Sequence, residues 1–303
     1  MAPEWPMPTS ADTSRPYWLR RVFPDFGPTG RCLVLLAACA FTPAAQAHDS
    51  WFEVQPAMRA GDIALALATG TRFPKQESSV GAGALARHGC RHGAAPRVPL
   101  LIVRDTPGAL QLRARVVTAP SLVAGHGAIS CWAQLVPFEV DIAAATVELY
   151  FKEVNPPAAV REAWREMQTR GVGWHERYTK HVRIERYDER LGTGEPPAAA
   201  PAAMGLDIVL DGPLRPPAAG DTIAFQVQRD GQPLPDFAVE LQSALTPIGI
   251  WLKTDAQGRA QVRLPLAGAY LLRGVDLRLS ASVPDSWESR FIMLTFDAMA
   301  RRP

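Results

Sequence analysis

The sequence predicts a mainly β protein built from two β-sandwiches with a helical hairpin between them. Proline and glycine are frequent, with 28 and 23 residues in a chain of 303. They separate short runs in which every second residue is apolar, which is typical of strands joined by tight turns. These runs fill residues 51–152 and 208–296, and a charged segment with helical spacing lies between them.

The first 47 residues are predicted to be a leader that ends in a signal peptide. The apolar run at residues 32–41 has about half of the length that a membrane-spanning helix needs. It follows Arg31 and precedes TPAAQA at residues 42–47, whose small-x-small ending is typical of a signal peptidase site. We therefore expect cleavage between Ala47 and His48, and a periplasmic or secreted mature chain with no transmembrane span.

Two other export signals overlap this region. LAAC at residues 36–39 fits a lipoprotein box, in which Cys39 would be acylated, although the apolar run before it is short. RRVF at residues 20–23 resembles half of a twin-arginine signal, but Pro24 and Arg31 interrupt the path to the apolar run. A lipoprotein anchored at Cys39 is therefore the alternative localisation.

Residues 48–154 are predicted to form the N-terminal sandwich. Ile63, Leu65 and Leu67 alternate with small residues after a turn at residues 60–62, which indicates a strand, a turn and a second strand. Further alternating runs are predicted to be strands, and they cover residues 98–103, 109–118 and 143–152.

Two cysteines remain after the leader, Cys90 and Cys131. In an oxidising compartment they are expected to form one disulfide, which would close a loop and add roughly 3 to 4 kcal/mol of stability. Cys90 lies inside HGCRH at residues 88–92, where two histidines flank it. The glycines beside them favour a solvated loop over a metal site in this segment.

A helical hairpin is predicted at residues 155–190. Asn155-Pro156-Pro157 is a helix start signal, and it is followed by apolar residues at the spacing of one buried helix face. WHERYTKHVRIERYDER, from residue 174 to 190, is predicted to be the second helix. The high density of charge indicates that most of this hairpin faces solvent.

Residues 191–205 are predicted to be a linker, and residues 206–297 a C-terminal sandwich. The linker is rich in proline, alanine and glycine. Seven short strand patterns follow it, at residues 208–210, 223–227, 238–242, 250–253, 260–264, 268–273 and 290–296. This density of strands is typical of an immunoglobulin-like or transthyretin-like sandwich.

Composition and motifs argue against two classes of function. The chain has 32 lysines and arginines against 30 acidic residues, a net charge of +2, so it lacks the basic excess of a nucleic-acid-binding protein. The sequence has no G-x-S-x-G, phosphate-binding loop, dinucleotide-binding glycine pattern or H-E-x-x-H. WHE at residues 174–176 and DSWES at 285–289 offer acid–base groups without a nucleophile. We therefore predict that the protein is not an enzyme.

His48 is chemically special if cleavage occurs after Ala47. An N-terminal histidine offers its α-amine and its imidazole Nδ1 to one metal ion as a chelate, and the amine loses its proton near pH 8. Nitrogen donors bind Cu²⁺ more tightly than Ni²⁺. The candidates for a further ligand are His126, His175, His181 and Asp49.

Four motifs resemble those of an uncharacterised periplasmic family formerly labelled as the substrate-specific component of nickel uptake. They are HDSWFEVQP from residue 48, ERYTKH at 176–181, TDAQGRAQVRLP at 254–265 and DSWES at 285–289. The resemblance implies an exported, β-rich protein that starts with histidine after its signal peptide, and it places a family histidine at His181. Cys90, Cys131 and the HGCRH segment are not part of the family pattern.

The expected function is binding of a copper or nickel ion for uptake, delivery or buffering. His48 would supply the amine and one imidazole, and His181 the second imidazole. The partner would be the metal ion together with a membrane transporter or an outer-membrane receptor. The alternative is a periplasmic module that binds proteins or carbohydrates without a metal, a common role of immunoglobulin-like sandwiches.

Overall fold

A long β-sheet forms the middle layer of the fold. The computed structural model describes residues 48–57, 59, 61–92, 96–116, 128–187, 204–211 and 216–301. The strands of this central sheet are β3 (Leu85–His92), β6 (Ala128–Leu135), β7 (Phe138–Ile142), β8 (Trp174–Tyr187), β12 (Ala238–Ser243), β13 (Thr246–Lys253), β15 (Gly268–Leu279) and β16 (Trp287–Ala298). Among the described residues their order is β13-β12-β15-β16-β8-β6-β3, and β7 pairs with the first part of β8.

Several predicted features lie outside the described residues. They are the leader with its cleavage site at Ala47, the alternative lipid anchor at Cys39, the candidate ligand His126, and residues 191–203 of the predicted linker.

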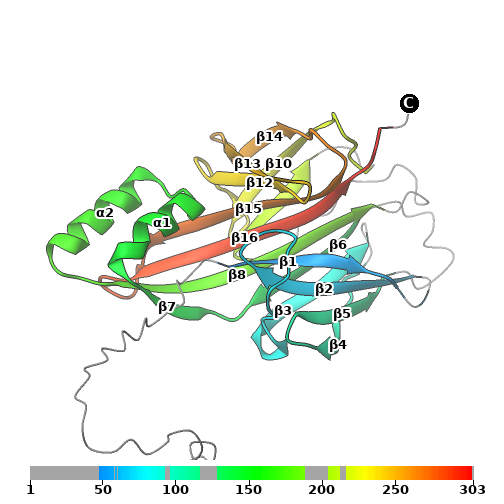
Figure 1. The fold of residues 1–303 in the computed structure, drawn as a ribbon, viewed down its shortest axis with the longest axis horizontal. Coiled ribbons are helices and arrows are strands. Elements are labelled where there is room, and N and C mark those ends of the chain that lie inside the picture. Colours follow the sequence, from blue (N-terminus) through cyan, green and yellow to red (C-terminus); the bar gives the residue numbers. More distant parts are fainter. Residues whose placement is uncertain are drawn as a thin grey trace, which may run out of the picture. The chain divides into compact units, whose positions relative to one another are not determined.

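Two smaller sheets accompany the central sheet. One consists of β1 (Asp49–Gln55), β2 (Asp62–Gly70), β5 (Ala109–Arg115) and β4 (Leu101–Asp105), in that order. The other contains β11 (Gln232–Pro233), β10 (Thr222–Arg229) and β14 (Arg259–Arg263), with β9 (Leu206–Asp211) paired to β10. Figure 1 shows β1 and β2 beside β8 and β16, and β10 and β14 near β12 and β15.

The two smaller sheets pack on opposite faces of the central sheet. Successive side chains of a strand point to opposite faces. On β8, Val182 and Ile184 join the hydrophobic cluster that contains β1 and β2, whereas Arg183 between them reaches Asp207 of β9. The central sheet is therefore apolar on both sides, and each side has its own hydrophobic core.

Two helices cover the end of the central sheet where β8 begins and β15 ends (Figure 1). They are α1 (Ala144–Val154) and α2 (Ala158–Thr169). Trp164 of α2 lies edge-on to Trp174 of β8 with ring centroids 5.3 Å apart, and Trp174 stacks on Trp287 of β16 at 4.5 Å. These aromatic contacts fix the helical pair against the sheet.

The prediction of a strand at residues 143–152 is wrong, because this segment forms α1. Its buried residues, Val147, Tyr150, Phe151 and Val154, recur at intervals of three and four and so share one helix face. Their β-branched and aromatic side chains favour strands, but this spacing buries them on the sheet only in a helix.

The prediction of a second helix at residues 174–190 is also wrong, because residues 174–187 form β8. The two described α-helices, α1 and α2, lie within residues 144–169. They therefore begin before the predicted range of 155–190 and end well inside it. The charged residues of β8 suggested a solvated helix. In the structure Lys180, Arg183 and Glu185 are buried and bonded to polar partners. A strand that is buried on both faces does not show simple alternation.

The HGCRH segment is not a solvated loop but part of β3. Cys90 and Cys131 face each other across the β3–β6 pair and form the predicted disulfide. Both cysteines are fully buried. The bridge therefore joins two neighbouring strands of the central sheet inside the core.

The central sheet contains strands from both of the predicted sandwich regions. β3, β6 and β7 come from residues before α1, and β12, β13, β15 and β16 follow residue 206. β8 joins the two groups, because it pairs antiparallel with β6 and parallel with β16.

Arg183 forms the buried polar centre of this junction. Its guanidinium donates hydrogen bonds to Glu185 over 2.6 Å and to Asp207 over 2.8 Å, and the Ser130 hydroxyl donates to Glu185 over 2.8 Å. The side chains of Arg183 and Glu185 are fully buried. Their charges therefore depend on one another for stabilisation.

We expect removal of the disulfide to destabilise the fold strongly. The bridge closes a loop with a sequence separation of 41 residues, for which the loss of loop closure is worth about 4 kcal/mol. The double substitution Cys90→Ala and Cys131→Ala should lower the free energy of unfolding by this order in a denaturant titration. A reduced parent protein should behave alike, and an unchanged denaturation midpoint would contradict the role of the bridge.

Arg183→Ala should cost about 3–5 kcal/mol of stability, because it leaves two buried carboxylates without their cation. Arg170→Ala is the matched control, since it breaks an ion pair with Asp285 in which both side chains are about half exposed, and it should cost at most about 1 kcal/mol. Equal losses in denaturant titrations of the two variants would show that burial of the Arg183 cluster is unimportant.

Candidate functional site

His48 directly precedes β1, and a side chain of β8 forms a hydrogen bond with its backbone. The Lys180 ammonium donates a hydrogen bond to the His48 carbonyl oxygen over 2.6 Å. The next residue, Asp49, is buried and accepts a hydrogen bond from Arg273 over 2.9 Å. Ser50 follows, and its hydroxyl bonds to Thr69 of β2 over 2.8 Å. The backbone of His48 therefore has a fixed position at the edge of this layer.

The imidazole of His48 is accessible and faces a carboxylate. Its side chain is 42% exposed, and its Nε2 lies 3.8 Å from Oε2 of Glu77. Glu77 in turn accepts hydrogen bonds from the Thr71 backbone N–H over 2.9 Å and from the Thr71 hydroxyl over 3.0 Å. These bonds lower the pKa of Glu77 below its ordinary value. The carboxylate is thus oriented and ionised next to the imidazole.

Lys180 of β8 is a buried amine next to the backbone of His48. Burial lowers the pKa of Lys180 to about 8, although the neighbouring Asp49 carboxylate opposes the shift. Its contacts are the His48 carbonyl and, at 3.4 Å, the Ser50 hydroxyl. Lys180 therefore positions the His48 backbone and presents little additional charge at alkaline pH.

His181 lies on the other face of the central sheet. It follows Lys180 on β8, so its side chain points away from β1. Its Nδ1 donates a hydrogen bond to the Phe291 carbonyl oxygen over 3.0 Å. Its Nε2 faces Gly205, where an added Cβ would lie only 3.5 Å away. Burial lowers the pKa of His181 to about 4. The structure therefore does not bring the imidazoles of His48 and His181 together.

Two other described candidate ligands already have partners. His175 is 46% exposed and pairs through Nδ1 with Asp141 over 2.9 Å, at the β7–β8 pair. Asp49 is occupied by Arg273. In the described part of the chain, no group of three or more histidine, cysteine, aspartate or glutamate side chains is arranged to hold a metal ion.

Glu77 is the residue that the sequence analysis missed. It lies between β2 and β3, in a segment with no periodic pattern, and it reaches His48 because residues 77 and 78 bond back to Thr69. An acidic residue seven positions after the end of a strand is a weak signal in the sequence. Only the pairing of β1 with β2 shows that this segment passes the start of β1.

Glu176, part of the WHE group considered for acid–base chemistry, lies inside the protein. It accepts hydrogen bonds from the Tyr150 hydroxyl and the Trp174 indole, each over 2.9 Å, and from the Ser289 hydroxyl. Burial raises its pKa. With an exposure of 1% it has no access to a substrate, and its bonds tie α1 to β8 and β16.

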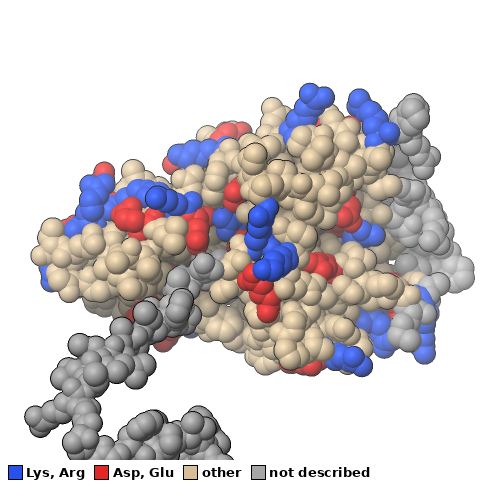
Figure 2. All heavy atoms as spheres, in the orientation of Figure 1, with Lys and Arg blue, Asp and Glu red and all other residues tan. Residues whose placement is uncertain are grey.

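The surface charges are mixed. Figure 2 shows lysine and arginine side chains on this face interspersed with acidic ones and not gathered into one patch. This distribution agrees with the small net charge of +2, and the described part of this face shows no basic patch matched to a polyanion.

The fold is that of a mainly β protein with several sheets. The chain belongs to the family described as "Domain of unknown function (DUF4198)", whose model matches residues 45–275. A comparison with curated proteins gives no match. One similar solved structure is the D0-D1 domain of Intimin, with 10% sequence identity, a TM-score of 0.20, and coverage of 83% of this chain and 97% of that one. Within the described residues, no helix is long and apolar enough to cross a membrane.

We expect acid to destabilise the fold through His181. Burial lowers its pKa in the folded protein to about 4, from an ordinary value of 6.5. As the pH falls through this window, the unfolded chain takes up a proton that the folded chain refuses, so stability decreases. The free energy of unfolding should fall by about 3 kcal/mol more in the parent than in His181→Gln between neutral pH and pH 4.

Denaturant titrations at a series of pH values measure this difference. His175→Gln is the matched control, because it changes a half-exposed ring on the same strand and leaves the buried His181 ring in place. If His181→Gln also keeps that dependence, the buried ring does not cause it.

Proposed function

We propose that the mature chain is an exported, non-enzymatic protein that binds a copper or nickel ion through its N-terminal His48. Cleavage between Ala47 and His48 would free the α-amine beside the imidazole. The observation that carries the proposal is the accessible His48 side chain with Nε2 3.8 Å from the Glu77 carboxylate. The α-amine and the imidazole Nδ1 offer two donors to one ion, and Glu77 lies on the Nε2 side, where a carboxylate can orient the ring.

The donor set favours copper over nickel. Two nitrogen donors suit divalent ions late in the first transition row, and Cu²⁺ forms the tightest complexes in that series. The Lys180 bond to the His48 carbonyl fixes the backbone of the chelating residue. Such support limits the ordering that metal binding would otherwise require.

An open site suits transfer of the ion. The His48 side chain is 42% exposed, so a partner's ligands can reach a bound ion without unfolding of the protein. We therefore propose a role in metal uptake, delivery or buffering, with a membrane transporter or an outer-membrane receptor as the partner.

A periplasmic or secreted localisation supports this function. The Cys90–Cys131 bridge is of a kind that persists in oxidising compartments. Family membership over residues 45–275 includes the start of the mature chain, and the family resemblance described above adds the nickel label to this proposal.

The test is a Cu²⁺ and a Ni²⁺ titration of mature protein against a competing chelator. The protein should be released from a fusion by a protease that leaves His48 as its first residue. We expect Glu77→Gln to weaken binding by about tenfold or more, within the range for loss of one supporting group at a metal site. His48→Ala should weaken it further, because the imidazole donor is lost and the remaining amine can no longer chelate.

A sharper variant retains residues 43–47, PAAQA, before His48. It keeps the imidazole and Glu77 but moves the α-amine five residues away, so it should bind less tightly than the parent if the amine is a ligand. His181→Gln should leave the affinity unchanged, since its ring lies on the opposite face. Equal affinity of the parent, His48→Ala and the extended variant would refute the proposed function.

A further inference from the structure

One edge of β15 is only half covered by a neighbouring strand. β15 pairs with β16 along its whole length, from Gly268 to Leu279. On its other edge, pairing with β12 runs only from Tyr270 to Arg273. The chain before β12 turns aside at Asp236, whose φ is 57°, and bonds there to Thr254. In the described chain, the last six residues of β15 therefore have no partner strand on this edge.

Two hydrogen bonds near the ends of β15 show which neighbouring strand each of its residues bonds to. The Ser280 N–H donates to the carbonyl oxygen of Ser286, just before β16 begins, and the Ala244 N–H donates to the carbonyl oxygen of Ala269 on the β12 side. Backbone groups of an antiparallel strand alternate between its two neighbours. Even-numbered residues therefore bond to β16. The N–H and C=O groups of Val275, Leu277 and Leu279 point to the open edge.

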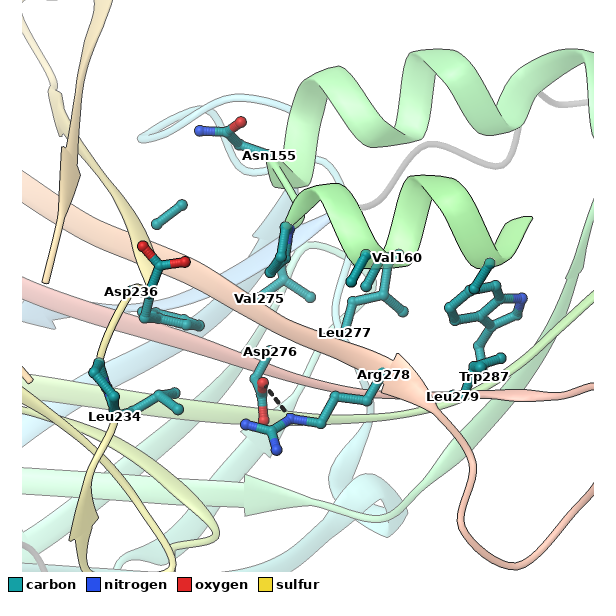
Figure 3. Close-up of a pocket in the computed structure, with 16 residues that line it drawn as sticks. Asn155, Val160, Leu234, Asp236, Val275, Asp276, Leu277, Arg278, Leu279 and Trp287 are labelled. Atoms are coloured by element: carbon teal, nitrogen blue, oxygen red, sulfur yellow. Dashed lines mark hydrogen bonds and ion pairs between the residues drawn. The ribbon is translucent and has the colours of Figure 1, made fainter. Parts of the chain in front are cut away.

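A cavity of about 370 Å³ lies beside this open edge. α2 contributes one wall with Val160 and Ala163, and the segment Leu234–Ala238 bounds the other end. Figure 3 shows Val160 of the helix next to Leu277, with Leu234 and Asp236 on the far side. The cavity thus combines a helix, an apolar wall and a row of backbone donors and acceptors.

The two sides of the open edge differ in chemistry. Val275 and Leu277 point to the core that contains α2. Asp276 and Arg278 alternate with them on the opposite side, where Arg278 donates to Asp276 over 2.8 Å and Arg229 pairs with Asp276 over 3.0 Å. Residues that lie opposite each other in paired strands point to the same face. A strand added here would therefore meet apolar and charged surroundings in alternation.

We propose that this edge of β15 binds an extended peptide segment of a partner protein, by addition of a strand between β15 and α2. Another extended backbone matches the spacing of this row of N–H and C=O groups, whereas an apolar small molecule would leave them unbonded. The bound segment alternates apolar residues, directed to α2, with polar residues, directed to Asp276 and Arg278.

A second copy of this chain fits the edge poorly. The open edge lies in a recess between α2 and the segment Leu234–Ala238. Two identical recessed edges cannot approach closely enough to pair, whereas a single extended segment can enter. The proposal therefore concerns a peptide and is independent of metal binding at His48.

The first test is amide hydrogen exchange of the free protein at single-residue resolution. Leu277 and Leu279 should exchange faster than Asp276 and Arg278, whose amides bond to β16. Slow exchange at all four positions would show that the edge is already covered and would overturn the proposal.

The second test is selection of short random peptides displayed against the whole protein. We expect enrichment of sequences that alternate apolar and polar residues. Leu279→Pro removes one N–H from the open edge and leaves the β16 ladder intact, because proline is tolerated where its nitrogen needs no partner. It should weaken binding of a selected peptide by about tenfold, the loss of about one hydrogen bond.

Matched variants separate the backbone from the side chains. Leu279→Ala keeps the N–H and should bind more tightly than Leu279→Pro. Ala163→Glu places a charge in the apolar wall and should weaken binding, whereas Gln168→Glu places one on the exposed side of the same helix and should not. Thermal melting of each variant verifies that it is folded.

Three outcomes would overturn the proposal. One is that no peptide is enriched over the Leu279→Pro protein. Another is equal affinity of a selected peptide for the parent and for both Leu279→Pro and Ala163→Glu. The third is dimerisation of the parent that Leu279→Pro abolishes, since a second copy would then occupy the edge.

Discussion

The burial of β8 on both faces is the constraint on which the rest of the structure depends. This strand carries charged residues into the middle of the fold, and its parallel pairing with β16 joins strands that are far apart in the chain. Parallel pairing needs a long connection and cover on both faces. On one face of β8, Arg183 donates hydrogen bonds to Glu185 and Asp207. On the other face, Lys180 donates a hydrogen bond to the His48 carbonyl oxygen. The layers on the two faces are thus attached to one strand by polar as well as apolar contacts.

The position of His48 follows from this arrangement. β1 lies over β8 because Phe52 and Trp51 pack into the shared core, and Thr295 of β16 donates a hydrogen bond to the Phe52 carbonyl over 3.0 Å. Lys180 and Arg273 then fix the first residues of the strand. The free energy that orders the start of β1 therefore comes from the sheet below it. The imidazole itself remains accessible because it lies beyond the edge of that contact.

The sequence allowed prediction of those elements whose burial is one-sided. β10 is an example, since Ile223, Phe225 and Val227 are buried and alternate with more exposed residues. The disulfide was predictable because two cysteines follow the predicted leader. β8 was not, because its buried charges resemble a solvated helix until their partners are known, and those partners come from Ser130, Asp207 and the start of β1. For the same reason the sequence suggested a His48–His181 pair, whereas strand alternation separates the two rings. Glu77 could not be predicted, because its place depends on bonds back to Thr69.

Arg273 links the two regions for which we propose binding. It is the last β15 residue paired with β12, and its guanidinium bonds to Asp49 beside His48, to Glu240 of β12 and to the Glu153 carbonyl at the end of α1. One buried cation thus ends the paired part of β15, anchors the first strand and holds the helix that precedes the cavity wall. Its replacement would loosen all three contacts together and leave carboxylates without a cation. Loss of function in such a variant would therefore be uninformative, whereas Glu77 and Leu279 each touch only one of the two proposed sites.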